Sequence, residues 1–294
     1  MEFVCNFMTA EAHPATWARQ REAEGWDLIS VADHFFSSTR PFPHVWVTAA
    51  AMAQATDTVG VTTAFVNNLF RSPVEVAQAA LEMQMVADGR FELGLGAGWA
   101  REEIEAAGMV YPSPGLRAGA YAESAEVVRS LIHSGSCHFS GEHYQIDIDM
   151  LGPLSPTPPL LVGSVGGPRT IREVTPHCDR VELKPASAAT RDGAVDMELM
   201  AAVRDDDLIE LIARVRDVDP DIELGVFLLC NVADDARTNA IASSMGDGLY
   251  HRFFGSAEKF ADGIAWLESV GISRCQISPF DDSSFDRLAP VLFR

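Results

Sequence analysis

Two polar residues, Asp33 and His34, come directly after an apolar segment, Leu28–Ala32. A polar pair in this position serves a hydrophobic core poorly, because burying such groups without partners costs free energy. Histidine has the side chain whose unperturbed pKa lies nearest neutrality, so it can donate or accept a proton in catalysis. The pair therefore indicates a site of proton transfer. The alternative is that Asp33 caps the next segment and His34 is merely exposed.

The segment 91–99, "FELGLGAGW", carries glycine at alternate positions: Gly94, Gly96 and Gly98. A dinucleotide-binding turn needs G-x-G-x-x-G opening directly into a helix, whereas here Trp99 follows and no amphipathic crossover helix comes next. The pattern instead predicts a strand whose end lacks side chains, so that a flat ligand can lie against the backbone. The alternative is tight glycine packing inside the core.

A second glycine cluster lies in the segment 158–174, "PPLLVGSVGGPRTIREV". We expect a strand to end at Gly163 and a helix to begin near Pro168. The free N–H groups of Gly166 and Gly167 would then point out of a helix start, which is an arrangement that binds anions such as phosphate. A plain strand-to-helix turn is the alternative.

A third polar turn lies in the segment 62–73, "TTAFVNNLFRSP". We expect a strand to end at Ala64 and Phe65, and Asn67 and Asn68 to turn the chain before a helix that starts near Pro73. An Asx-type turn would also explain the two asparagines.

Metal and nucleophile motifs give little support to other chemistries. The eight histidines show neither H-x-x-x-H nor H-E-x-x-H, and no G-x-S-x-G nucleophile turn occurs. Two backbone-lined sites and one histidine therefore favour an enzyme in which an organic redox cofactor carries out the chemistry.

The elements that position these residues recur at wide intervals. Strand-like, largely apolar stretches are Phe3–Met8, Leu28–Ala32, Val59–Ala64, Phe91–Gly96, Leu160–Gly163, Asp179–Leu183, Glu223–Cys230 and Arg274–Ser278. Helical patterns between them are Pro14–Gly25, Pro73–Val86, Arg117–Ile132, Asp205–Val215 and Ser256–Val270. Eight buried strands alternating with helices predict an α/β fold, a (β/α)8 TIM barrel that occupies residues 1–294 as one domain. A doubly wound sheet with a second domain is the competing fold, but no Gly-, Ser- or Pro-rich linker divides the chain.

Two segments interrupt the alternation. Ser136–Pro159 contains "CHFSGEHYQIDIDM", whose alternation around Gly141-Glu142 predicts an inserted β-hairpin. Residues 186–204 could form a mobile loop or a short helix over a site.

Composition restricts the classes of partner. The 22 basic residues face 42 acidic ones and give a net charge of −20, so nucleic acid and anionic membrane are poor partners. No apolar run of ~18 residues predicts a membrane span, and the start of the chain lacks the features of a signal peptide. The cysteines are odd in number and form no C-x-x-C pair, which favours reduced thiols and a cytoplasmic setting: Cys5, Cys137, Cys178, Cys230 and Cys275.

The segment 69–99, "LFRSPVEVAQAALEMQMVADGRFELGLGAGW", with "DHF" upstream and "PPLLVGSVGG" downstream, resembles the bacterial luciferase-like flavin and deazaflavin oxidoreductases. The resemblance covers roughly Phe3 to Asp179, and the last strand and helix also fit. R-x-P followed by G-R-x-x-L-G-x-G-x-G-W is the specific part of it. The chain is most similar to the subgroup that depends on coenzyme F420.

The resemblance implies a barrel that carries the cofactor at the carboxyl ends of its strands. Asp33 would meet the deazaflavin head, and His34 would lie near the reacting carbon. A cis peptide between Ala64 and Phe65 would support the back of the ring. The further cofactor contacts that it implies are Asn67, Gly96, Ala97, Gly98, Gly163, Ser164, Gly166 and Gly167.

The chain departs from the family pattern at several positions. Gln84 and Ala87 stand where an aspartate and a serine are usual, which we expect to affect packing or a cap. The sugar-phosphate dehydrogenases of the family carry a glutamate at the position of Trp99 and a tryptophan where this chain has Ser37 and Ser38. We therefore do not expect glucose 6-phosphate as the substrate.

These observations predict an oxidoreductase that transfers a hydride between F420 and a small organic substrate, with His34 handling the accompanying proton. The alternatives are a monooxygenase that uses FMN and oxygen, and a flavin-binding barrel without turnover. The resemblance also implies a homodimer. We expect no metal ion at the site.

Overall fold

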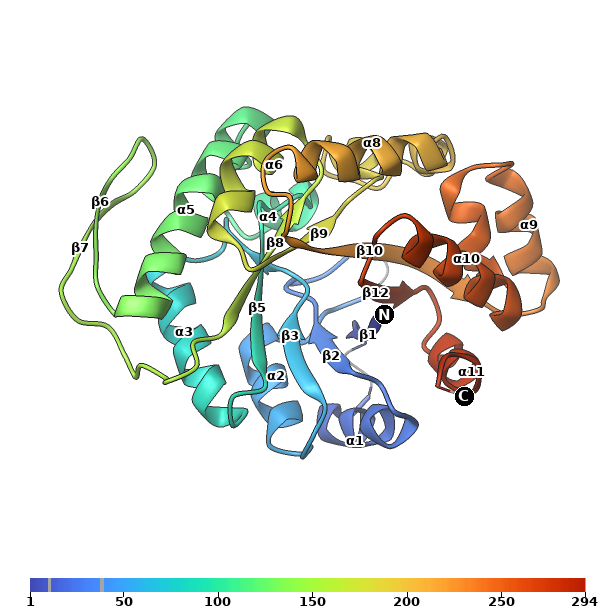
Figure 1. Cartoon of the computed structure of the whole chain (residues 1–294), viewed down its shortest axis with the longest axis horizontal. Coiled ribbons are helices and arrows are strands. Elements are labelled where there is room, and N and C mark those ends of the chain that lie inside the picture. The colour runs from blue at the N-terminus through green and yellow to red at the C-terminus, as the bar shows by residue number, and fades with distance from the viewer. Residues whose placement is uncertain (10–11, 38–39, 294) are drawn as a thin grey trace.

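The computed structural model describes residues 1–9, 12–37 and 40–293. Within these residues eight parallel strands close into a barrel, as predicted (Figure 1). In order around the barrel they are β1 (Glu2–Phe7), β2 (Leu28–Val31), β3 (Gly60–Thr63), β5 (Phe91–Gly96), β8 (Leu160–Val165), β9 (Arg180–Leu183), β10 (Glu223–Val232) and β12 (Arg274–Pro279). Closure is direct, because β12 pairs with both β10 and β1.

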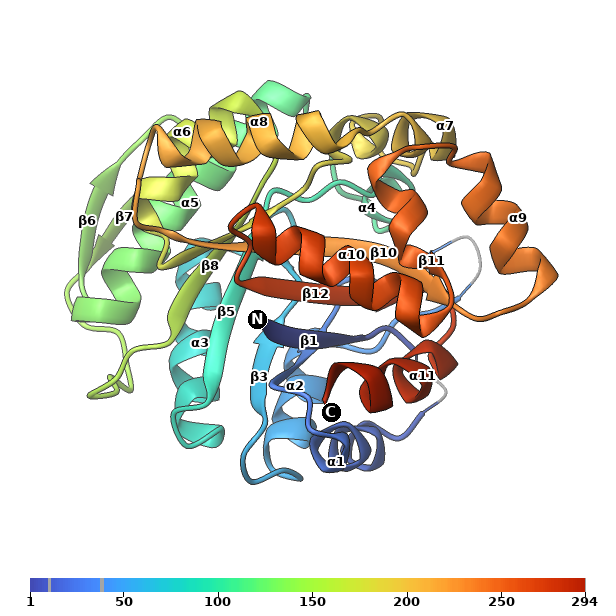
Figure 2. The ribbon, with the colours of Figure 1, turned by 45° about the vertical axis from the view of Figure 1, so that its right-hand side comes forward.

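Helices surround this barrel (Figure 2). The longer ones are α1 (Pro14–Glu24), α2 (Val45–Ala53), α3 (Pro73–Val86), α5 (Pro114–Ser134), α8 (Asp205–Arg216), α9 (Ala236–Ser244), α10 (Ala257–Ser269) and α11 (Ser283–Leu292). Their starts follow ordinary capping chemistry. The Ser72 hydroxyl accepts a hydrogen bond from the Glu75 N–H at the start of α3. The sequence patterns missed α2, α9 and α11. Neither α2 nor α11 has a side-chain N-cap. The start of α9 is capped by Asp235, whose carboxylate accepts from the Thr238 N–H, but its last turn carries no basic residue.

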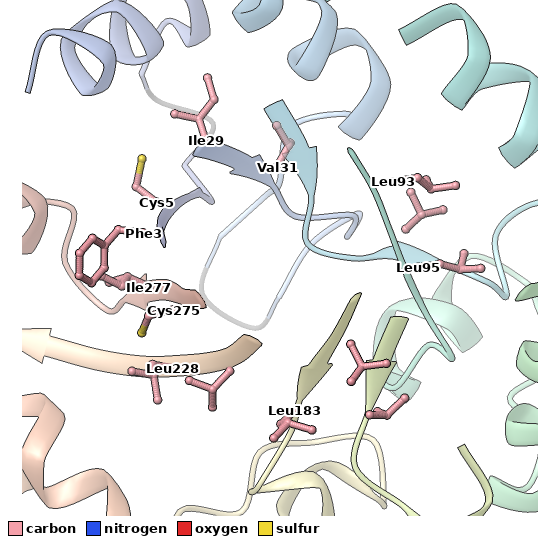
Figure 3. Packing of buried hydrophobic residues seen from close by; sticks show 14 of the residues in the cluster. Phe3, Cys5, Ile29, Val31, Leu93, Leu95, Leu183, Leu228, Cys275 and Ile277 are labelled. Atoms are coloured by element: carbon pink, nitrogen blue, oxygen red, sulfur yellow. The ribbon is translucent and has the colours of Figure 1, made fainter. Parts of the chain in front are cut away.

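The strands place apolar side chains toward the helices. Phe3, Cys5, Ile29, Leu93 and Leu228 belong to one continuous buried cluster and lie on the outer side of the strands (Figure 3). The alternate positions face the barrel axis, because successive side chains of a strand point to opposite faces. The large hydrophobic core of this fold is therefore the layer between strands and helices.

The barrel interior, in contrast, contains charged and polar groups. Arg274 is fully buried and contacts the carboxylates of Glu92 and Glu182, the latter at 3.3 Å from its Nε. Arg180 pairs with Glu2 at 2.7 Å and also contacts Glu223. Buried charges need such partners, because an unpaired ion loses its hydration without compensation.

The predicted insertion is a hairpin of β6 (Cys137–Ser140) and β7 (Gln145–Ile148), paired antiparallel and projecting beyond α5 (Figure 1). Its tip is anchored to the body of the protein. The Glu123 carboxylate accepts hydrogen bonds from the N–H groups of Glu142, His143 and Tyr144 at 2.7–3.0 Å.

Residues 186–204 form no long helix. A single turn of 3-10 helix, η2 (Ser187–Thr190), precedes the five-residue α7 (Met197–Ala201). Of the two expectations for this segment, the short helix is the one that the structure contains.

Candidate active site

The predicted site residues lie at the carboxyl ends of β2, β3, β5 and β8, and in the turns that follow these strands. Parallel barrel strands all end at the same face, so residues distant in sequence meet there. The fold thus brings the predicted site residues to one face of the barrel.

Asp33 acts as a tie between strand ends. Its carboxylate accepts hydrogen bonds from the Asn67 N–H at 2.8 Å and from Arg71 Nη1 and Nη2 at 2.5 and 3.1 Å. Asp33 is only 4% exposed. Such a two-pronged pair with arginine is among the stronger polar contacts in proteins. Asp33 thus fastens the end of β2 to β4 (Val66–Asn67) and to the residue before the Ser72 cap of α3.

His34 points to a different partner. Its Nδ1 lies 2.6 Å from Oε1 of Glu103, and the Phe35 N–H donates to Oε2 of the same carboxylate at 2.8 Å. Glu103 is 1% exposed and stands on α4 (Arg101–Ala106). An ionised carboxylate only accepts hydrogen bonds, so Nδ1 carries the proton and Nε2 is left to face a ligand.

Aromatic rings complete the surroundings of His34. Its ring centroid lies 5.1 Å from that of Phe42 and 5.7 Å from that of Trp99, the latter edge to face. The His34 side chain is 19% exposed, so the imidazole is held in place yet accessible.

Sequence reasoning missed Glu103. The segment "REEIEA" offers three glutamates, and only the contact of α4 with His34 and Phe35 after the end of β2 selects Glu103. The sequence predicts no crossover helix after the glycine strand. The structure agrees to the extent that α4 has six residues, but this short helix supplies the partner of His34.

The third polar turn contains the expected backbone feature: the peptide bond between Ala64 and Phe65 is cis. The Asn67 side chain accepts a hydrogen bond from the Leu69 N–H at 3.0 Å, so the alternative of an Asx turn holds for this side chain. Asn68 donates to the Tyr144 hydroxyl at 3.2 Å, while its Oδ1 is buried without a protein partner among the described residues. That orphaned acceptor can take a donor from a bound ligand.

The glycines of β5 serve two purposes. A Cβ at Gly94 would overlap the Thr63 carbonyl oxygen, so this glycine is needed for packing, as the alternative stated. A Cβ at Gly96 would lie 3.2 Å from the Cβ of Phe65, and Gly98 has φ +78°. The partly buried Ala97 continues this backbone. The Cβ position of Gly98 is already filled, since a Cβ there would overlap Asn67 Oδ1 and lie 2.9 Å from Leu69 Cδ1. Residues 96–98 therefore bring the backbone close to Phe65 and Asn67 at the mouth of the barrel.

Gly163 lies within β8 and points in a direction that the sequence did not predict. A Cβ at Gly163 would lie 2.5 Å from Cys178 Sγ, so this residue faces α6 (Pro168–Val174) and not the barrel mouth. Burial raises the pKa of that Cys178 thiol to about 12, so it stays protonated. Ser164 does face the interior, because its Cβ is 3.8 Å from the position of a Cβ at Gly96.

The sequence predicts free N–H groups at Gly166 and Gly167, but in the structure neither group is wholly free. They lie 3.5 and 3.3 Å from the Thr170 hydroxyl, at the edge of hydrogen-bond distance. A Cβ at Gly167 would have only this hydroxyl, at 3.9 Å, within reach, so the approach to its backbone is open. The turn remains able to receive an anion, with Thr170 as a competing acceptor.

Two cavities lie in this part of the molecule, and Gly166 is the one predicted site residue among those that line them. The first, about 350 Å³, is lined by Gly166, Pro185, Ala188, Leu199, Ala202, Val203, Asp207, Glu210, Leu211 and Arg214. The second, about 360 Å³, is lined by Thr9, Arg40, Asn231, Asp235, Arg237, Thr238, Ile241, Phe280, Asp281 and Asp282. The Arg40 guanidinium lies 5.1 Å from the centre of the Phe42 ring, so one aromatic ring separates the second cavity from His34.

Two departures from the family pattern have structural settings. Gln84 is buried; its amide accepts from the Phe91 N–H at 3.0 Å and donates to the Thr157 carbonyl at 2.9 Å, which matches the expected packing role. Ala87 is also buried and ends α3. Ser38 lies outside the described residues.

Comparison with known proteins places this site in a family. The model of the luciferase-like monooxygenases matches residues 10–260, and the chain belongs to this family. An F420-dependent glucose-6-phosphate dehydrogenase of Amycolatopsis mediterranei is 32% identical over 134 residues, which cover 44% of this chain and 40% of that relative. One of Mycobacterium avium is 34% identical over 133 residues, 42% and 39% of the two chains. The chain thus spans less than half the length of these curated relatives.

Solved structures show the same fold. An F420-dependent secondary alcohol dehydrogenase in complex with an F420-acetone adduct superposes with a TM-score of 0.73, at 19% identity, over 99% of this chain and 97% of that one. The monooxygenase RslO1 of Streptomyces bottropensis gives a TM-score of 0.75 at 16% identity, over 100% and 97%. The two solved structures, a dehydrogenase and a monooxygenase by name, thus share this fold, so the fold alone does not fix the reaction.

The described residues contain neither a candidate membrane span nor a candidate metal site. None of the helices there combines the length and apolar character of a membrane span. Likewise, no cluster of three or more His, Cys, Asp or Glu side chains in that part of the chain could hold a metal ion.

Proposed function

We propose that this protein is a coenzyme F420-dependent oxidoreductase that transfers a hydride between the deazaflavin and a small organic substrate. One observation carries the proposal: the His34 imidazole is fixed by Glu103 through Nδ1 at the same barrel face as the glycine-rich backbone of residues 96–98. A proton-transfer group and a backbone segment that we assign to the cofactor ring thus share one face of the barrel.

The residues present fit the cofactor. Gly96, Ala97 and Gly98 would lie along the ring, Phe65 and Asn67 behind it, and Ser164, Gly166 and Gly167 near its phosphate. Asp33 would act indirectly, because its carboxylate is occupied by Arg71 and Asn67 and holds the strand ends that carry these contacts. Gly163 would contribute through its backbone alone.

The chemistry divides between cofactor and protein. F420, when bound, supplies hydride transfer at a carbon of its ring. His34 would give or take the accompanying proton through Nε2, while Glu103 holds the tautomer and orientation of the imidazole. The rings of Phe42 and Trp99 would keep water away from the imidazole.

The choice of F420 over FMN is supported by the curated relatives, which are named for F420. An FMN-dependent monooxygenase is the second candidate function, because a solved monooxygenase has the same fold. A binding barrel without turnover is a third candidate, and the buried carboxylate that orients His34 argues against it, since storage needs no oriented proton donor.

For the substrate, we propose a small organic molecule other than glucose 6-phosphate. The relatives carry that sugar phosphate in their names. In this chain Trp99 occupies the position at which we expected a glutamate in such enzymes, and its ring packs edge to face against His34. An apolar ring there favours a less polar substrate near the imidazole.

Cofactor titration tests the proposal. Isothermal titration of the purified protein with F420 and with FMN should show tighter binding of F420. Incubation of the F420-loaded protein with a panel of unsaturated ketones, nitroaromatics and alcohols, in both cofactor redox states, should change the cofactor absorbance for at least one compound. Equal or tighter binding of FMN would favour the monooxygenase, and binding of F420 without any turnover would favour the non-catalytic barrel.

We also propose that the protein is a cytoplasmic homodimer. The cysteines of the described residues are all free, as a reducing compartment would keep them. The face of α3 that carries Met85, 58% exposed, offers apolar surface to a second copy.

A further inference from the structure

A lysine stands at the mouth of the barrel. Lys184 follows the last residue of β9, and its N–H donates to the Val165 carbonyl at 2.8 Å, which continues the pairing of β9 with β8. Leu183 is buried in the outer core, so the alternation turns Lys184 inward, above Glu182. Its ammonium therefore points into the space at the strand ends.

Aromatic rings surround this ammonium. Lys184 Nζ lies 3.2 Å from the centre of the Phe227 ring and 4.6 Å from that of Phe65. Phe65 is also the residue that packs against Gly96. The positive charge is thus held beside the backbone edge to which we assign the cofactor ring.

Within the part of the chain that the structure describes, neither a hydrogen bond nor an ion pair reaches Nζ. Glu182, two residues earlier on the same strand, attracts the ammonium electrostatically but forms no ion pair with it. Glu182 is engaged elsewhere, because Arg274 contacts it at 3.3 Å and the Gln276 amide, with its nitrogen turned toward it, donates at 2.8 and 3.2 Å. Arg71, which precedes the Ser72 cap of α3, is in turn occupied by Asp33.

The residue type is itself informative. The 22 basic residues of the sequence include two lysines, Lys184 and Lys259, and the other 20 are arginines. Lysine differs from arginine because burial can bring its pKa close to neutrality. Burial lowers the pKa of Lys184 to about 7, and Glu182 partly opposes that shift.

We propose that Lys184 is a substrate-binding residue whose ammonium holds a carboxylate group of the substrate, so that the substrate is a small organic acid with an apolar or aromatic body. A single ammonium between two phenylalanine rings fits one carboxylate, with the rings packing against the rest of the molecule. This assignment deepens the proposed function and rests on it for its catalytic meaning.

Binding of benzoate and of benzamide, its neutral analogue, tests the assignment. Isothermal titration at pH 6.5, with and without F420, should show benzoate bound more tightly than benzamide. Lys184→Met should weaken benzoate at least tenfold and leave benzamide unchanged, whereas Lys259→Met should change neither. Thermal melting checks folding, and we expect Lys184→Met to melt no lower than wild type because methionine suits a partly buried site.

The pH dependence gives a second readout. Lys184 faces Glu182 on its own strand, with Arg274 of β12 and Glu92 of β5 one layer below; β10 presents uncharged Phe227 and the turn after β3 presents uncharged Phe65. An anion favours the charged amine and raises its pKa, so benzoate affinity should fall as pH rises from 6 to 8.5. Lys184→Arg should bind benzoate without this fall, because arginine stays charged.

Labelling makes the residue directly visible. Protein grown on lysine labelled at the ε-carbon should give two side-chain NMR signals, and Lys259→Arg should leave the one from Lys184. Benzoate should move the titration midpoint of that signal upward, whereas benzamide should not.

Unchanged benzoate affinity in Lys184→Met, or an unmoved Lys184 signal, would overturn the assignment. Benzoate binding through Lys184 in a protein that binds neither F420 nor FMN would refute the proposed function and leave this site standing.

Discussion

The carboxylate of Asp33 offers the sharpest test of how the strand ends are held together. Asp33→Ala removes three hydrogen-bond acceptor contacts at once, to the Asn67 N–H and to both terminal nitrogens of Arg71. It also leaves the Arg71 guanidinium, whose side chain is only 13% exposed, with Glu75 at 3.7 Å as its remaining partner. The change thus removes a tie and leaves a largely buried cation poorly compensated.

The expected cost follows from this geometry. Removal of one partner of a buried ion pair costs about 3–5 kcal/mol, and the residual exposure of Arg71 reduces this to roughly 2–4 kcal/mol. Arg71→Met should cost as much or more, because Asp33, 4% exposed, would keep a single backbone donor. The double variant should lose roughly 2–3 kcal/mol less than the sum of the two single variants, since one interaction cannot be lost twice.

Urea unfolding of the four proteins, followed by circular dichroism and by tryptophan fluorescence, measures these free energies of unfolding. Arg214→Met is a matched control, because its pair with Glu210 is an exposed i,i+4 contact on α8 and should change stability by less than about 0.5 kcal/mol. Additive effects of Asp33→Ala and Arg71→Met, or single costs as small as that of the control, would refute the reasoning.

Four further predictions concern the site and the assembly. His34→Ala should lower turnover by roughly 10²–10⁴-fold with little loss of F420 affinity, whereas His138→Ala, on the exposed hairpin, should leave turnover unchanged in the same absorbance assay. Glu103→Gln should lower turnover by roughly 10–100-fold, and ¹H–¹⁵N spectra should show His34 losing its single tautomer; an unaltered spectrum would contradict the orienting role. Gly98→Ala places a side chain at φ +78° and in overlap with Asn67 Oδ1, so it should displace Asn67, destabilise the protein by at least about 1–2 kcal/mol in urea and weaken F420 binding in titration; a wild-type binding curve would argue against residues 96–98 as the ring site. Light scattering at micromolar concentration should give the mass of a dimer, and a monomer mass would reject the homodimer.

Much of the architecture could be predicted because it is written in local patterns. The eight strands are recognisable as short, largely apolar runs, and Asp33 and His34 directly follow one of these runs. The cis peptide and the glycine-rich end of β5 could be predicted because a specific string of residues resembles a known family. These features depend on residues that are close in sequence.

The partners of the site residues could not be predicted in this way. Glu103 meets His34 across 69 positions, and Arg71 meets Asp33 across 38. Asp33 and His34 are adjacent in sequence yet serve separate contacts, because consecutive side chains at a strand end diverge. The orientation of Gly163 could not be predicted for the same reason: a shift of one position along β8 decides whether a residue faces the helices or the barrel mouth.

The barrel puts its hydrocarbon on the outside of the strands and its charges on the axis, which separates two demands on the sequence. The layer between strands and helices accounts for the burial of apolar surface, so its residues are constrained by the stability of the fold. The axial layer that includes Arg274, Glu182 and Lys184 answers to electrostatics, and a substitution there alters the field at the mouth with little loss of hydrocarbon burial. Substitutions in the axial layer below the site can therefore change which molecules the barrel binds, while the apolar layer that stabilises the fold stays the same.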